Sequence, residues 1–318
     1  MNRRGFLATG IGAFVAAPSL HRFGGWRGMV TTPRAELRLV ERWSWAMGQP
    51  VHIRLFHHDE SAGLEAAHAA FTELWRVESK LSLFDSASDL SELNRRAGTA
   101  SMVVDKDLAT VLTAAAEFRR VTGGAFDVAV EPLMRAWGFR EPRRAPPGAR
   151  ELAEAREAVR AAVLRLEGDR AALPVACTAL DLGGIGVGYG LDRASAALRR
   201  LDVRSALIDV SGDLLAIGTP PGEAAWPIDI VDSRTEGLVI ATAHIRDQAL
   251  ATSSNARSVV HFGRMVRGHV MDPAAGIPVE GTLQSTVVAA TGIAADALST
   301  AAMVLGHTPP GALASWLL

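Results

Sequence analysis

Cysteine and lysine are scarce in this chain, and the scarcity of cysteine excludes two kinds of covalent chemistry. Cys177 is the one cysteine among 318 residues, so no disulfide can form within the chain. It also lies far from the N-terminus, which excludes a lipid-modified cysteine directly after an export signal. Because Cys177 lies in the apolar segment Leu173–Leu180, we expect it to be a small buried core residue.

The chain also lacks an excess of either positive or negative charge. The chain carries 33 basic and 34 acidic side chains, a formal net charge of −1, and its lysines are Lys80 and Lys106 alone. No strong positive field is present to attract nucleic acid or an anionic membrane, so we expect neither as a partner of the folded body. With 48% hydrophobic and 21% charged residues, the composition is typical of a globular protein with a large core.

The N-terminus has the pattern of a targeting segment. Paired arginines in Asn2–Ala8 stand directly before the apolar run Phe6–Ala17, which is too short to span a bilayer comfortably. Small residues at Val15–Ala17 suit cleavage. This resembles a twin-arginine signal peptide over residues 1–30 and predicts an exported, periplasmic or extracytoplasmic protein. A short N-terminal membrane anchor is the alternative.

Residues 35–318 are predicted to form a single α+β domain, because helices and short strands alternate without a regular βαβ rhythm. Alternation predicts a strand at Gln49–Phe56. A stripe of Leu64, Ala67, Phe71, Leu74 and Trp75 predicts a helix at Ser61–Val77. The segment Glu141–Arg150 is an expected exposed loop. The remaining expected elements are helices at Leu108–Val121, Glu151–Val163 and Asp192–Leu201, and strands at Val163–Leu166, Ala179–Leu182, Ser205–Val210, Trp226–Val231, Leu238–His244 and Ser258–His261.

A glycine-rich bend at Asp181–Asp192 is the first candidate for chemistry. Backbone N–H groups can approach a phosphate closely at such a turn, and a following helix N-terminus favours the anion. The bend contains neither G-x-G-x-x-G nor a P-loop, so the common dinucleotide and triphosphate motifs are excluded. Close packing of a helix on a sheet through glycine is the alternative explanation.

A second candidate is the pair Asp296 and Thr300, one turn apart in the predicted helix Ala295–Thr300. A carboxylate and a hydroxyl on one face are hard oxygen ligands of the kind that Mg²⁺ takes. An exposed aspartate beside a threonine bonded to its own helix is the alternative. His269 also stands out, because Pro273, Gly276 and Pro278 fix a rigid turn after it.

Taken in order, these segments resemble the ApbE family of flavin transferases. The resemblance covers about Met47–Gly306 and rests on Met47–Gly48, Phe84–Asn94, Gly123–Phe139, Asp181–Asp192, Asp209–Asp213, Ala251–Ser253, His269–Pro278 and Ala295–Thr300. It implies an ApbE-like, T-fold-related arrangement of mixed sheets with packed helices, and an FAD site between two subdomains. It also implies Mg²⁺-dependent transfer of FMN from FAD to a Thr or Ser hydroxyl of an acceptor protein, with release of AMP. The acceptor would be an extracytoplasmic flavoprotein or a redox-complex subunit.

The resemblance also implies roles for individual residues. The FAD site would be lined by Met47, Phe84, Ala125, Phe126, Asp127, Asp181, Val187 and Met271. The metal would be held by the Gly184 carbonyl, Asp296 and Thr300, with Ser299 as a further contributor. His269 and Asp272 are the expected catalytic pair: His269 would lie by the reacting phosphate, and Asp272 would support its turn.

Four positions depart from the family pattern. Val187 replaces a lysine, and Ala129, Phe84 and Ser211 stand where Thr, Tyr and Gly are common. The lost lysine charge keeps two alternatives open, a flavin-binding protein without transfer activity and an FAD pyrophosphatase that gives free FMN. A periplasmic solute-binding protein is a third. If the chain is a flavin-binding protein that has lost transfer, restoring Lys at position 187 should raise its transfer activity.

Overall fold

The computed structural model describes residues 37–256, 258–281 and 284–318. The expected signal peptide therefore lies outside the described residues. These described residues belong to one compact unit. In the described ranges no helix is both long and apolar enough to cross a membrane.

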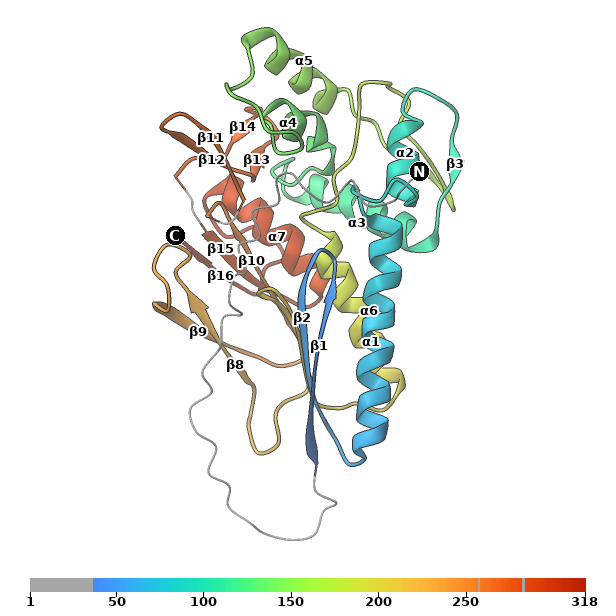
Figure 1. The fold of residues 1–318 in the computed structure, drawn as a ribbon, viewed down its shortest axis with the longest axis vertical. Coiled ribbons are helices and arrows are strands. Elements are labelled where there is room, and N and C mark those ends of the chain that lie inside the picture. Colours follow the sequence, from blue (N-terminus) through green and yellow to red (C-terminus); the bar gives the residue numbers. More distant parts are fainter. Residues whose placement is uncertain (1–36, 257, 282–283) are drawn as a thin grey trace, which may run out of the picture. The chain divides into compact units, whose positions relative to one another are not determined.

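A seven-stranded antiparallel sheet forms the centre of this unit (Figure 1). Its strands, in spatial order, are β1 (Arg38–Ala46), β2 (Gln49–His57), β6 (Ala206–Val210), β7 (Asp213–Ile217), β10 (Ala249–Ser254), β15 (Gln284–Ala289) and β16 (Ala314–Leu317). The β1–β2 connection is a two-residue turn in which Met47 and Gly48 have φ of 56° and 69°. Positive φ at both positions is the geometry of a type I′ hairpin, whose twist matches that of the strands.

Three helices pack together against one face of the sheet: α1 (Glu60–Leu81), α6 (Gly186–Arg200) and α7 (Gly292–Leu305). The α1 helix begins at Asp59, whose side chain accepts the Ala62 N–H. Of the predicted stripe it buries Ala67, Phe71 and Leu74 and half-buries Leu64. Trp75 is 41% exposed and donates its indole N–H to the Trp45 carbonyl.

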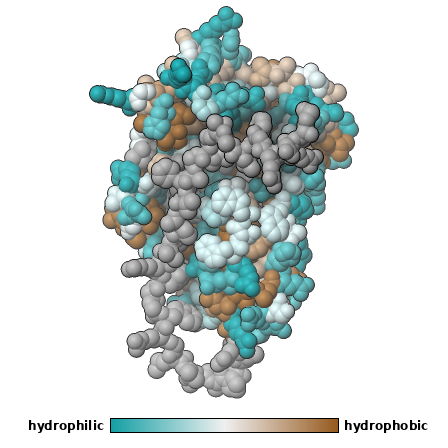
Figure 2. Space-filling model, viewed as in Figure 1, coloured by the Kyte–Doolittle hydropathy of each residue, from teal (hydrophilic) through white to brown (hydrophobic). Residues whose placement is uncertain are grey.

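The opposite face of the sheet is only partly covered. The hairpin β8 (Trp226–Val231) and β9 (Val239–Ile245) packs on β6, β7, β10 and β15 through an apolar cluster that includes Leu207 and Leu250. The outer side of β1 is left open, with Trp43 55% and Trp45 64% exposed. Figure 2 shows side chains of intermediate hydropathy gathered over β1 and β2.

A second apolar core lies beside the helix layer and is built mainly from α2 (Asp89–Arg95), α3 (Lys106–Val121) and the glycine-rich bend. Around it lie the short helices α4 (Glu131–Ala136) and α5 (Ala149–Arg160), the 3-10 turn η1 (Val128–Val130) and small sheets. The small sheets contain β3 (Met102–Val103), β4 (Arg165–Glu167), β5 (Arg170–Ala172), β11 (Val259–Phe262), β12 (Met265–Gly268), β13 (Met271–Asp272) and β14 (Ile277–Pro278). Met47 packs against both cores.

Three sequence expectations were wrong. The segment 179–182 is not a strand: the Asn94 side chain takes the place of a neighbouring strand, accepting the Leu180 N–H at 2.8 Å and donating to the Leu180 carbonyl at 2.9 Å. The next helix begins at Gly186 rather than Asp192, inside the glycine-rich bend. Cys177 is exposed, not a core residue.

Candidate functional site

The glycine-rich bend brings the starts of α6 and α7 into direct contact. A Cβ at Gly188 would lie 2.1 Å from the Gly292 carbonyl oxygen, so only glycine allows this approach. The Gly188 N–H donates to Asp296 at 2.9 Å. In return Asp192 accepts the N–H groups of Gly292 and Ile293 at 2.7 and 2.9 Å. The bend thus packs helix on helix, and places Asp296 against its backbone.

The four predicted metal-binding residues lie together at this contact. A Cβ at Gly184 would be 2.9 Å from the Thr300 hydroxyl, so the bend and the third turn of α7 are in contact. The Ser253 hydroxyl on β10 is 2.8 Å from that of Ser299 and 3.2 Å from that of Thr300. Asp296 and Ser299 are 5% and 1% exposed. The result is a buried group of oxygen atoms from three segments.

Asp213, at the start of β7, is a further carboxylate of this group. Burial, and then the negative charge of Asp213, raise the pKa of Asp296 well above its usual value. Asp213 also accepts the Thr252 N–H at 3.0 Å. A cation would relieve the repulsion between the two carboxylates. The sequence had singled out the turn ending at Asp213 without linking it to the metal.

The donors of this group fit Mg²⁺. They are carboxylate, hydroxyl and carbonyl oxygens, and Mg²⁺ takes few protein ligands and keeps waters or substrate phosphates in its other positions. Over residues 37–256, 258–281 and 284–318 there is no group of three or more His, Cys, Asp or Glu side chains that could hold a metal ion. A soft-ligand site of the zinc type therefore finds no support in this part of the chain.

A second group gathers around Asp181. Its carboxylate forms an ion pair with Arg140, which also binds the buried Glu131. The Arg140 guanidinium lies 5.5 Å from the centre of the Phe84 ring, and Phe84 is 83% exposed. The Asp181 N–H donates to the Val128 carbonyl at 2.7 Å, which fixes the entry to the bend. Phe84 and Asp181, both predicted to line the FAD site, are thus linked through one arginine.

His269 belongs to the same neighbourhood. Its side chain is half-buried, and its Nδ1 atom is buried without a hydrogen-bond partner in the described structure. Burial lowers its pKa, the Asp181 charge opposes this, and the Arg140 charge adds to it. A neutral imidazole with a free ring nitrogen is able to accept a proton or bind a ligand. The Asp272 carboxylate accepts the N–H groups of Ala274 and Ala275, as expected of a residue that supports the turn.

The remaining predicted FAD residues form the walls of the bend or lie in the apolar cores. Asp127 accepts the Ala129 N–H at 2.9 Å and pairs with Arg119 at 2.7 Å. Phe126 reaches to 3.5 Å from a Cβ placed at Gly184, beside the buried Ala125. Val187 and Met271 are buried in apolar clusters. Val187 is 8% exposed and lies in the main core, and Met271 is 4% exposed and lies beside α4 and α5. Position 187 therefore contributes no charge.

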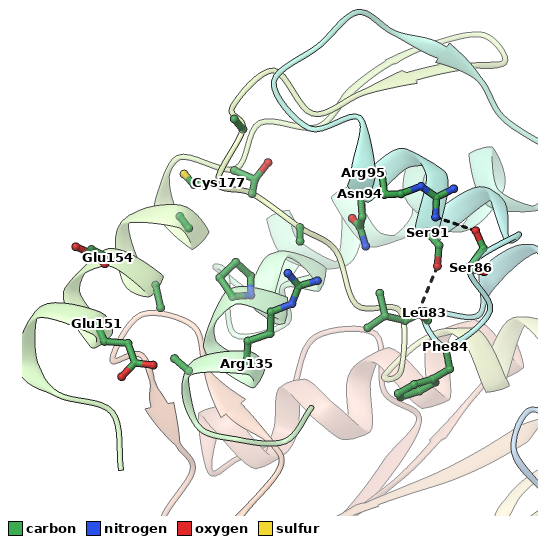
Figure 3. Close-up of a pocket in the computed structure, with 17 residues that line it drawn as sticks. Leu83, Phe84, Ser86, Ser91, Asn94, Arg95, Arg135, Glu151, Glu154 and Cys177 are labelled. Atoms are coloured by element: carbon green, nitrogen blue, oxygen red, sulfur yellow. Dashed lines mark hydrogen bonds between the residues drawn. The ribbon is translucent and has the colours of Figure 1, made fainter. Parts of the chain in front are cut away.

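A cavity of about 750 Å³ lies among α2, α4, α5 and the segment 176–179 (Figure 3). Arg135 points into it from α4, and Cys177 lies at its edge. Of the residues predicted to bind FAD, only Phe84 lines it. The cavity is therefore a compartment next to the group around Asp181, distinct from the oxygen group on α7.

Comparison with known proteins places these features in a family. The model of the ApbE family matches residues 47–316. The FAD:protein FMN transferase of Treponema pallidum is 30% identical over 298 residues, covering 88% of this chain and 82% of that protein. That of Haemophilus influenzae is 28% identical over 284 residues, covering 86% and 82%.

Solved structures agree. The crystal structure of the ApbE protein of Thermotoga maritima has a TM-score of 0.77 at 28% identity, covering 85% of this chain and 87% of that one. The flavinyl transferase ApbE of Pseudomonas stutzeri, in its apo form, has a TM-score of 0.74 at 27% identity, covering 85% of each. These likenesses confirm the expected fold class.

Proposed function

The chain belongs to the ApbE family and is a transferase, and from that premise we propose that it moves FMN from FAD onto a Thr or Ser hydroxyl of an acceptor protein, with Mg²⁺ and with release of AMP. The observation that carries the proposal is the contact between the bend at Gly184–Gly188 and the oxygen group on α7. A hard cation site that lies directly against this bend suits the charged oxygens of a dinucleotide's two phosphates.

Each group has a role in this reaction. Asp296, Thr300 and the Gly184 carbonyl would hold Mg²⁺, with Ser299 and Asp213 beside them. The ion supplies positive charge to the pyrophosphate oxygens. The acceptor oxygen attacks the phosphorus of the FMN half, the anhydride P–O bond breaks, and AMP leaves with the bridging oxygen. His269, neutral because it is buried, takes the proton of the acceptor hydroxyl at Nδ1.

The test follows AMP release and covalent flavin together. We expect the protein, incubated with FAD, Mg²⁺ and an acceptor flavoprotein, to give equal amounts of AMP and of flavin-labelled acceptor. Asp296→Asn keeps an oxygen for the Gly188 N–H but removes the negative charge, and should lower the rate at least about a hundredfold. Asp192→Asn is the matched control, because Asp192 is a half-buried aspartate that caps α7 outside the oxygen group. Similar losses in both variants would refute the metal assignment.

The same assay separates the alternatives that Val187 leaves open. Free FMN with AMP, and no labelled acceptor, would indicate an FAD pyrophosphatase. Bound FAD with no AMP would indicate a flavin-binding protein without transfer activity. No bound flavin at all would favour a solute-binding protein of another kind.

We also propose that the protein is exported and meets an extracytoplasmic acceptor, since paired arginines precede the apolar run Phe6–Ala17. Replacing Arg3 and Arg4 by Lys should leave the protein in the cytoplasm. Fractionation of cells that carry either form tests this, and equal export of both forms would contradict it. The mass of the exported protein distinguishes a cleaved signal from a retained anchor.

A further inference from the structure

Arg140, directly after Phe139, has no role in the function proposed so far, yet it contacts or neighbours several of the predicted site residues. Its side chain is 18% exposed and bridges two carboxylates, those of Glu131 and Asp181. Its guanidinium also lies over the Phe84 ring, 5.5 Å from the ring centre. The planar fork of arginine suits such a bridge, because its N–H groups point at two partners while its flat face stacks on a ring.

Arg135 offers an internal comparison. It binds the same buried carboxylate, with its Nε 2.8 Å from Glu131 Oε1, while the Nε of Arg140 is 2.8 Å from Glu131 Oε2. Arg135 is 62% exposed, however, and no contact of it with Asp181 or Phe84 is found in the described structure. The two arginines thus share their structural partner and differ in their reach towards the site.

Position 187 makes this cation more significant. Val187 lies in the apolar core, so the lysine that the resemblance led us to expect at that position is absent. The charged side chains that act on His269 are Asp181, from the bend, and Arg140; a backbone hydrogen bond with Ser258 acts on it as well. Arg140 is thus the cation of this group.

We propose that Arg140 is a positioning residue of the flavin-transfer site: its guanidinium holds Phe84 and Asp181 in the arrangement that binds FAD, and provides a positive charge beside His269. This rests on the proposed function. It assigns to this chain a cation that comes from the segment after α4 instead of from the glycine-rich bend.

The test compares Arg140→Gln with Arg135→Gln in the full chain. FAD affinity is measured by quenching of flavin fluorescence, and the rate of AMP release is measured against pH. We expect Arg140→Gln to weaken FAD binding about tenfold or more, the size of a lost charge-assisted hydrogen bond. Arg135→Gln should change it less than about twofold, as is usual for an exposed ion pair.

The pH profile has a defined sign. Removing Arg140 takes away a cation and leaves Asp181 without its partner, and both changes raise the pKa of His269. A histidine that acts as a base is inactive while it is protonated, and a raised pKa keeps it protonated up to a higher pH. The acid limb of the profile should therefore move to higher pH in Arg140→Gln and stay in place in Arg135→Gln. A purely structural role for Arg140 would lower the rate without moving this limb.

Arg140→Lys keeps the test decisive if Arg140→Gln does not fold. It retains the charge but cannot bridge both carboxylates, so we expect an unmoved acid limb and weaker FAD binding. Any one of three results would overturn the inference. The FAD affinity could be equal in the wild type and both Arg140 variants, Arg140→Gln and Arg135→Gln could lose equal FAD affinity, or Arg140→Gln could leave the acid limb in place. If the proposed function itself is wrong, the wild-type protein will give no flavin-labelled acceptor, whatever the Arg140 variants do to FAD affinity.

Discussion

Val187 stands where the family resemblance led us to expect a lysine, and burial decides what a lysine there would do. The side chain is 8% exposed and packs in the main core. The side chains that pack around Val187 in this core are apolar, and burying an ammonium group among them costs several kcal/mol. We therefore expect Val187→Lys to lower the melting temperature by at least about 5 °C and to give no gain in AMP release.

Val187→Met is the control for this substitution. The methionine side chain is long and unbranched like the aliphatic part of a lysine side chain, but it carries no charge, and protein cores tolerate it well. Equal losses in both variants would show that volume is limiting instead of charge. A higher rate in Val187→Lys would support the view that the natural chain has lost transfer activity.

Single residues of the site were predictable where a local motif carries them, and not where the chain brings distant residues together. Gly184, Ser299 and Thr300 lie together as the resemblance implied. Asp213 ends one segment of the resemblance and Arg140 directly follows another, but neither was assigned a role from the sequence, and only the folding of β7 and of the segment after α4 brings them to the site. The catalytic and binding roles themselves stay predictions.

At the scale of elements, the contact of α6 with α7 depends on one glycine. A Cβ at Gly188 would lie 2.1 Å from a backbone oxygen and 2.7 Å from the Asp296 Cβ, so Gly188→Ala must push the helices apart. We expect a loss of about 2–4 kcal/mol in the free energy of unfolding, typical of an overpacked core. Thermal or urea unfolding measures it.

Gly186→Ala is the matched control in the same helix. The nearest atom to a Cβ there is the Met47 methyl at 3.9 Å, an ordinary contact, and alanine favours a helix over glycine. Its stability should be unchanged or slightly higher. If Gly186→Ala proved as destabilising as Gly188→Ala, the close approach of α6 to α7 would not be the cause.

Elements with regular patterns were predicted well, and those with reversed or irregular patterns were missed. The stripe of α1 gave its position because most of its apolar side chains do face the core. Strand β1 was not predicted because its alternation is the reverse of the usual one: the apolar Trp43 and Trp45 point outward, and the polar Arg42 and Ser44 point towards the helices. The segment 179–182 has the apolar composition of a strand, but the Asn94 side chain takes its backbone hydrogen bonds.

At the scale of the whole molecule, the acid stability of the fold should depend on His52. This side chain stacks on Trp43 with the ring centres 3.8 Å apart, and burial, followed by the charge of Arg54, lowers its pKa from 6.5 to about 4. The unfolded chain then binds a proton that the folded one does not, so stability is complete above about pH 6.5 and is lost as the pH falls towards 4.

His52→Gln should flatten this dependence. We expect the difference in unfolding free energy between pH 7 and pH 4 to shrink in the variant, measured by urea unfolding at each pH. His244→Gln, on the exposed side of β9, is the control and should keep the wild-type slope. An unchanged slope in His52→Gln would show that other groups govern acid unfolding.

The two helices at the site fasten each other reciprocally. Asp192 on α6 holds the first amides of α7, and Asp296 on α7 holds an early amide of α6. Inserting one residue between positions 188 and 192 would turn one carboxylate about 100° away from its partner while the other stayed in place. In chimeras with a relative, these two segments should therefore be exchanged only as a pair. If one helix start were replaced alone, backbone N–H groups would lose their acceptor and a carboxylate would lose its donors inside the protein.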